Sequence, residues 1–258
     1  MFSYQSFLFN RTKTHFTSDE AREIILNDKF LMHVYVSHVQ TLYVAVASNT
    51  EAAQDEQIIE IGAAGGITKL IQPTITTLDV RQDLGVDLII SDELLPFENQ
   101  SITGAIGKDV FHHIPNVEKH LQEMRRVLMS GGKCAYIEPN WNLFSRIFYT
   151  LIHPEPWKPK QISWSFTSNN PMFSNQALPW IVFVRDLEIL AQKFPDLSLN
   201  IQEVPLVGLS YLISGGLNRR NRISSNMLIK LYKVEQKMPT YLKIFGLSRM
   251  VVITKLAG

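Results

Sequence analysis

A glycine-rich turn directly after a short apolar segment constrains the fold of this chain more than any other feature. Residues 58–66 read IIEIGAAGG, in which Glu60 lies near the end of the apolar run and three glycines follow. Glycine is needed where a backbone turns tightly and approaches a ligand closely, because it carries no Cβ atom. Open α/β sheets bind ligands at such turns, at the carboxyl ends of their strands. Alone the turn is ambiguous, since a strand-to-helix turn without a ligand has the same composition.

Short, β-branched apolar segments recur after this turn and predict parallel strands covered on both faces. They are residues 57–61, 75–78, 86–90, 102–106 and 133–137. Between the last two, apolar residues recur every three or four positions from Val117 to Leu128, and Gly131-Gly132 follows. This spacing predicts an amphipathic helix that stops at the glycines. A strand, a helix and a parallel strand form one α/β unit, so the predicted fold class is α/β.

The two ends of the chain and one internal segment depart from this alternation of strands and helices. Residues 1–50 predict a helical N-terminal extension, with one helix capped by Thr17 or Ser18 and a second over residues 29–47. Residues 140–180, rich in Trp, Phe, Pro and Asn, predict an aromatic-rich, lid-like insertion after the fifth strand. Further elements are expected at residues 178–194 (helix), 199–204 (strand), 225–237 (helix) and 249–256 (strand). We therefore divide the chain into an extension, 1–50, and a main domain, 51–258.

Composition and charge exclude several classes of protein. Lys and Arg total 25 against 24 for Asp and Glu, so the basic excess of nucleic-acid-binding proteins is lacking and we expect no such partner. Cys134 is the only cysteine, which allows neither an intramolecular disulfide nor a cysteine metal site and suits a cytoplasmic setting. We identify no signal peptide. The most apolar window, residues 30–48, carries His33 and His38 among other polar residues, which favours a buried helix over a membrane span.

Acidic residues also end the second and third predicted strands. Asp79 closes the second (TTLDV), where a carboxylate can accept hydrogen bonds from two ribose hydroxyls. Asp92 closes the third (LIISDE), where a carboxylate and nearby backbone N–H groups suit the edge of an adenine ring. One acid at a strand end is usually only solvated, but together with Glu60 three successive strand ends carry one. The pattern favours a cofactor site at this edge of the sheet.

Residues 57–140 resemble the class I S-adenosylmethionine-dependent methyltransferases, specifically the type 11 group. The matching segments are IIEIGAAGG, TTLDV, SDELLPFENQSITGAI and DVFHHIPNVEKHLQEMRRVLMSGGKCAYIEPN. The resemblance implies a Rossmann-like, mostly parallel sheet whose last strand is antiparallel. It also implies S-adenosyl-L-methionine as the cofactor and methyl transfer as the reaction.

The resemblance implies roles for eight residues around the cofactor: Glu60, Gly62, Ala64, Gly66, Asp79, Asp92, Glu93 and Lys108. The residues of the glycine turn would lie along the methionine and ribose portion. Asp79 would hold the ribose hydroxyls, and Asp92 with Glu93 would hold the adenine. Lys108, just past the fourth strand, would lie beside the methionine end.

The chain also departs from the family pattern in ways that bear on cofactor affinity. Ala64 stands where the family prefers its middle glycine, which adds a methyl group near the ligand. Pro73 cuts short the helix after Gly66, and the link from Asp79 to Val86 is too short for a full helix. These departures leave open the alternative of a catalytically inactive cofactor-binding or scaffold protein with a methyltransferase fold. A nicotinamide-dependent oxidoreductase is disfavoured, because the turn lacks GxGxxG spacing.

Three histidines are candidates for a general base on the acceptor side. Methyl transfer from a sulfonium is an in-line displacement, in which a base helps when the acceptor is a hydroxyl. His112 and His113 follow the fourth strand, and His153 lies in the insertion. The alternative for the histidine pair is structural packing in the turn. Glu138, at the end of the fifth strand, is a further candidate or only shapes the floor of the pocket. We expect no metal ion.

The acceptor itself is predicted only by class, as a small molecule that is apolar or anionic and is methylated on oxygen or carbon. Most aromatic side chains of the insertion are expected in the core, although contact with a membrane surface or an apolar substrate is an alternative use. Arg219, Arg220 and Arg222 follow a Ser-Gly-Gly turn. They form either a solvated loop or a clamp for a phosphate or carboxylate.

Overall fold

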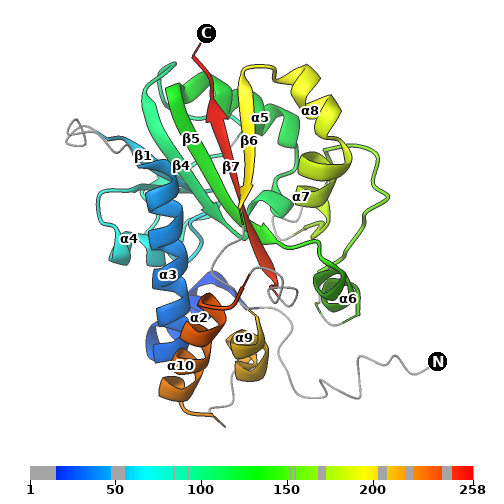
Figure 1. Cartoon of the computed structure of the whole chain (residues 1–258). Coiled ribbons are helices and arrows are strands. Elements are labelled where there is room, and N and C mark those ends of the chain that lie inside the picture. The colour runs from blue at the N-terminus through cyan, green and yellow to red at the C-terminus, as the bar shows by residue number, and fades with distance from the viewer. Residues whose placement is uncertain are drawn as a thin grey trace.

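A seven-stranded sheet forms the centre of the computed structural model, with helices on both of its faces (Figure 1). The structure describes residues 16–47, 56–83, 85–91, 93–151, 153, 155–167, 173–202, 208–218, 223–239 and 246–257. The strand order is β3-β2-β1-β4-β5-β7-β6. The strands are β1 (Ile58–Ile61), β2 (Thr76–Asp79), β3 (Leu88–Ile89), β4 (Ile102–Lys108), β5 (Leu128–Pro139), β6 (Leu197–Gln202) and β7 (Ser248–Lys255).

The first five strands pair in parallel, whereas β7 runs antiparallel to both β5 and β6. The predicted Rossmann-like sheet with an antiparallel last strand is therefore confirmed. Because β1, β2, β4 and β5 are parallel, their carboxyl ends lie along one edge, where the candidate cofactor and acceptor residues were expected. The third predicted strand is present but contributes only two residues.

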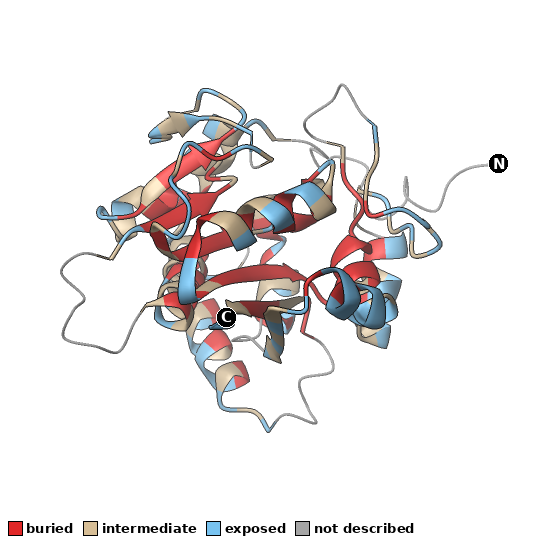
Figure 2. Ribbon diagram, turned by 90° about the horizontal axis from the view of Figure 1, so that it is seen from above, coloured by how far each residue is buried: buried red, intermediate tan, exposed pale blue. Residues whose placement is uncertain are grey.

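One face of the sheet is covered by α5 (Val117–Val127) and by the helical segments after the insertion. Buried residues concentrate along the strands and on the inward sides of the helices (Figure 2). The helical segments after the insertion are α7 (Leu178–Trp180), the π-helical turn η3 (Ile181–Arg185) and α8 (Leu187–Lys193). They pack Leu178, Val182 and Phe183 into the same core as Phe111 and Trp164. Trp164 confirms that part of the aromatic insertion belongs to the core.

The opposite face is covered by α3 (Lys29–Val46), which places Leu42 and Val46 against strands β1, β4, β5 and β7. Asp28 begins this helix by accepting hydrogen bonds from the N–H groups of Phe30 and Leu31. The preceding α2 (Ser18–Asn27) begins with a capping box between Thr17 and Glu20. Both N-terminal helices were predicted, the first from its capping residues and the second from its apolar pattern.

The remaining described helices gather near the carboxyl ends of the parallel strands and in the insertion. They are α4 (Ile67–Ile71), η2 (Phe111–His113), α6 (Leu143–Leu151), α9 (Leu209–Ser214), η4 (Gly216–Asn218) and α10 (Ser225–Gln236). A third core cluster joins α2, α3, α4 and α10, and α2, α10 and the lower part of α3 group together at the lower end of Figure 1. Within the described part of the chain, no helix is long and apolar enough to cross a membrane.

Two predicted element boundaries are wrong. The helix before the fifth strand does not run to Gly131-Gly132 but ends at Val127, and β5 begins at Leu128. Its last carbonyls accept hydrogen bonds from residues 100 and 101 ahead of β4, which draws the chain directly into the sheet. The helix expected over residues 178–194 is interrupted by η3, where the N–H of Asp186 donates to the carbonyl of Ile181, five residues earlier.

Candidate functional site

The glycine turn after β1 holds three residues in the left-handed region of backbone conformation. Gly62, Ala64 and Gly66 have φ angles of 68°, 45° and 61°. This region costs an L-residue with a Cβ roughly 1–2 kcal/mol, so Ala64 is strained where glycine would not be. A Cβ on Gly62 would lie 2.2 Å from Cγ2 of Val110, so glycine is required there by space as well as by conformation. Helix α4 begins directly after Gly66 and ends at Ile71, as the position of Pro73 predicted.

Asp79 lies beside this turn, at the end of β2. Its Oδ2 accepts a hydrogen bond of 2.9 Å from the N–H of Ala64. Its Oδ1 accepts from the backbone N–H and from Nε of Arg81, at 2.9 Å and 3.2 Å. The structure thus brings the turn and this acid together, and it gives the carboxylate three hydrogen bonds within the chain.

Glu60 is buried beneath the same turn and is incompletely paired. Its Oε1 accepts a hydrogen bond of 2.7 Å from the hydroxyl of Thr68, whereas its Oε2 has no hydrogen-bond partner among the described residues. Burial raises the pKa of Glu60 to about 7, against the hydrogen bond from Thr68. A buried carboxylate oxygen without a partner is costly unless a ligand or a proton pairs it.

The predicted adenine region is only partly described. Asp92 lies outside the described residues. The side chain of Glu93 extends toward α5, where its Oε2 lies 3.5 Å from Nζ of Lys119. The assignment of Asp92 and Glu93 to the adenine ring stays a prediction.

Lys108 ends β4 and meets a residue of the N-terminal helices. Its Nζ lies 4.9 Å from the centre of the Tyr35 ring, which α3 supplies, and it pairs with Asp109. Burial lowers the pKa of Lys108, but Asp109 and Tyr35 outweigh that effect and raise it. The ammonium group is therefore charged and held in place at this edge of the sheet.

His112 and Glu138 form a buried pair at the ends of β4 and β5. Glu138 Oε1 accepts hydrogen bonds from the N–H groups of Val110 and Phe111, at 2.8 Å and 2.7 Å. Its Oε2 accepts from Nδ1 of His112 at 2.6 Å. The side chain of Glu138 thus fixes both the turn after β4 and the orientation of the His112 ring.

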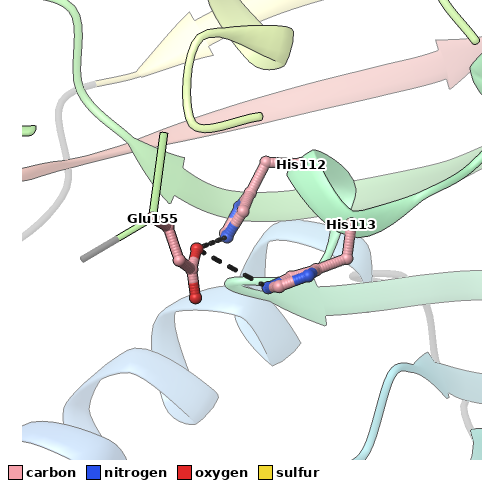
Figure 3. Close-up of side chains that lie close together, drawn as sticks. All are labelled: His112, His113 and Glu155. Carbon is pink, nitrogen blue, oxygen red and sulfur yellow. Dashed lines mark ion pairs between the residues drawn. The ribbon is translucent and has the colours of Figure 1, made fainter. Parts of the chain in front are cut away.

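Glu155 of the insertion meets both histidines, and we name His112, His113 and Glu155 the His–Glu cluster. Glu155 Oε2 lies 3.4 Å from Nε2 of His112 and 3.9 Å from Nε2 of His113. Figure 3 shows the three side chains converging, two from η2 and one from the insertion. The insertion is tied to η2 by the N–H of Asn175, which donates to the carbonyl of His112 at 3.0 Å.

The charge states of the two neighbouring histidines diverge. Burial would lower the pKa of His112, but Glu138 and Glu155 outweigh it and raise the pKa to about 10. Burial lowers the pKa of His113 to about 4, and the positive charge of His112 acts in the same direction. Burial would raise the pKa of Glu155, but the hydrogen bond and charge of His112 hold it well below its usual range.

His153, the third predicted base, lies next to this cluster in sequence but makes different contacts. Its Nδ1 accepts a hydrogen bond of 3.3 Å from the backbone N–H of Glu155. Its ring packs edge-on against Tyr149, with ring centres 5.3 Å apart. Burial lowers its pKa. Its contacts in the structure are therefore with the backbone and with an aromatic ring of α6.

Three residues of this region were not predicted from the sequence. Asp109 directly follows β4, much as Asp79 ends β2, so its position at a strand end could have identified it as a candidate site residue. Tyr35 arrives from a helix more than 70 residues earlier in the chain, and Glu155 comes from an irregular segment. Neither has a spacing that would connect it to the turn after β4. One open polar hollow beside α5 is lined by Asn116, Lys119, Gln122 and neighbouring residues, and no predicted site residue lines it.

Comparison with known proteins shows what this part of the chain is similar to. Residues 67–136, about a quarter of the chain, match the family model of a methyltransferase domain. The match begins directly after the glycine turn and includes Asp79, Lys108 and both histidines of η2. The resemblance to the class I S-adenosylmethionine-dependent methyltransferases is confirmed. No curated protein sequence matches the chain.

Solved structures show the same fold at low sequence identity. Geranyl diphosphate C-methyltransferase from Streptomyces coelicolor, in complex with Mg²⁺, geranyl diphosphate and S-adenosyl-L-homocysteine, is 11% identical with a TM-score of 0.50, covering 92% of this chain and 82% of that chain. A SAM-dependent methyltransferase from Archaeoglobus fulgidus is 11% identical with a TM-score of 0.50, covering 90% and 99%. Phosphoethanolamine N-methyltransferase 2 from Haemonchus contortus is 14% identical with a TM-score of 0.51, covering 100% and 61%. The likeness concerns the fold.

Proposed function

We propose that this protein transfers a methyl group from S-adenosyl-L-methionine to a small-molecule acceptor. The observation that carries the proposal is the arrangement around Glu60. A buried carboxylate with one oxygen unpartnered among the described residues lies under a glycine turn at the carboxyl end of the first strand. The cofactor carries an ammonium group on its methionine portion, and that group would pair the free oxygen.

The turn supplies the remaining features that an adenosyl cofactor needs. Gly62 and Gly66 adopt the left-handed backbone of a tight turn and carry no Cβ atom, so a ligand can approach the backbone closely. Asp79 lies at the end of the neighbouring strand, where ribose hydroxyls would replace part of its bonding to Arg81. Lys108 would flank the methionine end of the cofactor and offset the negative charge of Asp109.

The acceptor would lie on the side of β4 and β5, where the predicted bases stand. His112 and His113 lie in η2 directly after β4, and the insertion that carries His153 and Glu155 folds over them. Exclusion of water and alignment of the acceptor for in-line attack are the main physical contributions expected of such an enclosure. Use of His113 as a base is tested by His113→Ala with an identified acceptor. Full turnover of that variant would contradict it.

An apolar acceptor is supported by one exposed face of α6. Leu143, Ile147 and Leu151 recur every fourth residue and are 77%, 49% and 64% exposed. This stripe lies on the insertion, where the acceptor or a membrane surface would approach. The anionic alternative rested on Arg219, Arg220 and Arg222, which lie outside the described residues.

Isothermal titration with S-adenosylmethionine and S-adenosylhomocysteine tests the proposal directly. We expect saturable binding of both at one site per chain. Asp79→Asn is expected to weaken binding by at least about tenfold, as loss of a charge-assisted hydrogen bond of roughly 1.5–3 kcal/mol implies. Absence of binding of either ligand at high micromolar concentration would exclude cofactor-dependent methyl transfer.

One observation favours the alternative of a protein that keeps the fold without catalysis. Ala64 places a methyl group on the turn, and the carboxylate of Asp79 is already bonded to Ala64 and Arg81. In that case the internal bonds would replace the cofactor. The same titration separates the two functions, because a scaffold protein that has lost its cofactor would bind neither ligand.

A further inference from the structure

The His–Glu cluster joins two imidazoles and one carboxylate in a way that the proposed methyl transfer does not require. The ligating atoms of His112, His113 and Glu155 all lie within 4.8 Å of one another. We propose that this cluster binds one divalent transition-metal ion. From the sequence we expected no metal ion, because the chain has a single cysteine and methyl transfer does not require a metal. The sequence gives no signal that connects Glu155 with the two histidines.

Hydrogen bonds on the far side of each ring orient the two imidazoles for metal binding. Nδ1 of His112 donates to the carboxylate of Glu138 at 2.6 Å. Nδ1 of His113 donates to the carbonyl of Phe173 at 3.2 Å. In the neutral form of each ring, an acceptor at Nδ1 fixes the proton there and leaves the lone pair on Nε2, which is the nitrogen that faces Glu155 in both residues. Metal-ligating histidines have this arrangement, in which a carboxylate or carbonyl accepts from the other nitrogen.

The distances fit a bound ion after small shifts. Ligands about 2.0–2.1 Å from a tetrahedral ion lie roughly 3.3 Å from one another. The distance from Glu155 Oε2 to Nε2 of His112 is 3.4 Å, and that to Nε2 of His113 is 3.9 Å. Of these two distances only the second needs to shorten appreciably, and all three ligating atoms lie within 4.8 Å of one another.

A fourth polar atom beside the cluster has no partner within the described chain. Gln176 donates from its amide nitrogen to Glu155 Oε2, and it is only 2% exposed. Its amide oxygen is buried without a hydrogen bond to any described residue. Because both atoms belong to one amide group, this oxygen lies close to the cluster and is available to an ion or to a water molecule on it.

The ligand set selects a class of metal. Two imidazole nitrogens and one carboxylate suit Zn²⁺, Fe²⁺, Co²⁺ or Ni²⁺, whereas Mg²⁺ and Ca²⁺ prefer oxygen ligands alone. The carboxylates of Glu138, Glu155 and Asp109 also give the surroundings an excess of negative charge over Lys108, which favours a cation. Three protein ligands leave at least one coordination position open.

At the open coordination position the ion would bind the methyl acceptor. This role rests on the proposed function. An acceptor oxygen bound to the ion would lose its proton to water more readily, because a cation stabilises the anionic form, and the ion would then replace His113 in the role of base. The site therefore fits an acceptor with a metal-binding oxygen, such as a phenol or an enolisable carbonyl compound. The arrangement that competes with the metal is a protonated His112 held between Glu138 and Glu155.

Cobalt titration of the metal-free, tag-free full chain tests the proposal. Co²⁺ bound to nitrogen and oxygen ligands has visible absorption that reports its coordination, and Zn²⁺ should displace it. We expect one Co²⁺ per chain. His113→Ala and Glu155→Gln should each weaken binding at least tenfold, whereas His33→Ala, on α3 and outside the cluster, should leave it unchanged.

Thermal unfolding keeps the test interpretable if a substitution weakens the fold. The ion should raise the melting temperature of the wild-type chain and of His33→Ala, and it should not raise that of Glu155→Gln. Failure to bind cobalt, or equal binding by the wild type and both cluster variants, would overturn the proposal. Neither readout involves S-adenosylmethionine, so a negative result here leaves the cofactor titration unaffected.

Discussion

The cofactor side and the acceptor side of the sheet edge are held together by different physical means. Around β1 and β2 the site is held mainly by the backbone, through three residues with left-handed conformation and the N–H of Ala64, which donates to Asp79. Around β4 and β5 buried side chains carry it, with Glu138 bonded to two backbone N–H groups and to His112. A site held by the backbone can be recognised in a sequence from its glycines, whereas contacts between buried side chains cannot.

The two sides meet at a contact between Gly62 and Val110. The Gly62 turn packs directly on the Val110 side chain, and the N–H of Val110 donates to Glu138. Displacement of either partner would therefore disturb both sides. Substitutions that affect only the backbone turn or only the buried side-chain contacts can test whether the two sides are held in these different ways.

The largest effect is expected from Glu138→Ala. It leaves one buried N–H group, one part-buried N–H group and the His112 ring without their acceptor, which should lower the free energy of unfolding by about 3–5 kcal/mol. Chemical denaturation measures this loss. Glu118→Ala is the control, because Glu118 forms an exposed pair with Lys193 and its loss should cost less than about 1 kcal/mol. Equal costs for the two variants would contradict a structural role for the buried carboxylate.

Gly62→Ala should cost roughly 2–5 kcal/mol, from the left-handed backbone together with the clash against Val110. Gly131→Ala separates these two causes. Gly131 has a φ of 78°, and a Cβ added there would meet no atom within 4 Å, so only the conformational cost of about 1–2 kcal/mol applies. Chemical denaturation of both variants gives the comparison. If both lose the same stability, close packing between the two sides plays no part.

The smallest effect, of opposite sign, is expected from Ala64→Gly. Relief of the left-handed strain should exceed the entropic cost of glycine and stabilise the chain by up to about 1 kcal/mol, measured by denaturation. It should also tighten cofactor binding. Ala63→Gly is the matched control, because Ala63 lies outside the left-handed region and should lose stability instead. Stabilisation of both variants, or of neither, would show that Ala64 is not strained.

Much of the sheet was predictable because its signals are local. The apolar segments, the glycine turn and the acid at Asp79 each lie within a few residues of the feature they form, and each predicted strand overlaps an observed one. The π-helical interruption at η3 was not predictable, since its apolar residues suit a continuous α-helix equally well. The same holds for the early start of β5, which depends on hydrogen bonds to the segment before β4.

The candidate site divides along the same line. The positions of Glu60 and Asp79 at the edge of the sheet could be predicted from the strand ends, whereas the partners of His112 could not be predicted. Glu138 is 26 residues from His112 and Glu155 is 43 residues away, in a segment without regular spacing. Only the folded chain brings these three side chains together.

The proposed function depends most on one proposed contact, in which Glu60 and the glycine turn would bind the ammonium end of the cofactor. Three groups set the charge of Glu60 besides burial, namely Thr68, Asp79 and Lys108. Because burial raises its pKa to about 7, Glu60 must lose a proton to pair an ammonium group at lower pH. Titration calorimetry with S-adenosylhomocysteine from pH 8 to pH 6 measures this coupling.

Wild-type affinity should fall by up to about tenfold as the pH drops through that range, since most Glu60 is protonated at pH 6. Glu60→Gln should bind more weakly at pH 8 and show little change with pH. Equal affinity and equal pH dependence in the two proteins would contradict a role for the Glu60 carboxylate in holding the cofactor.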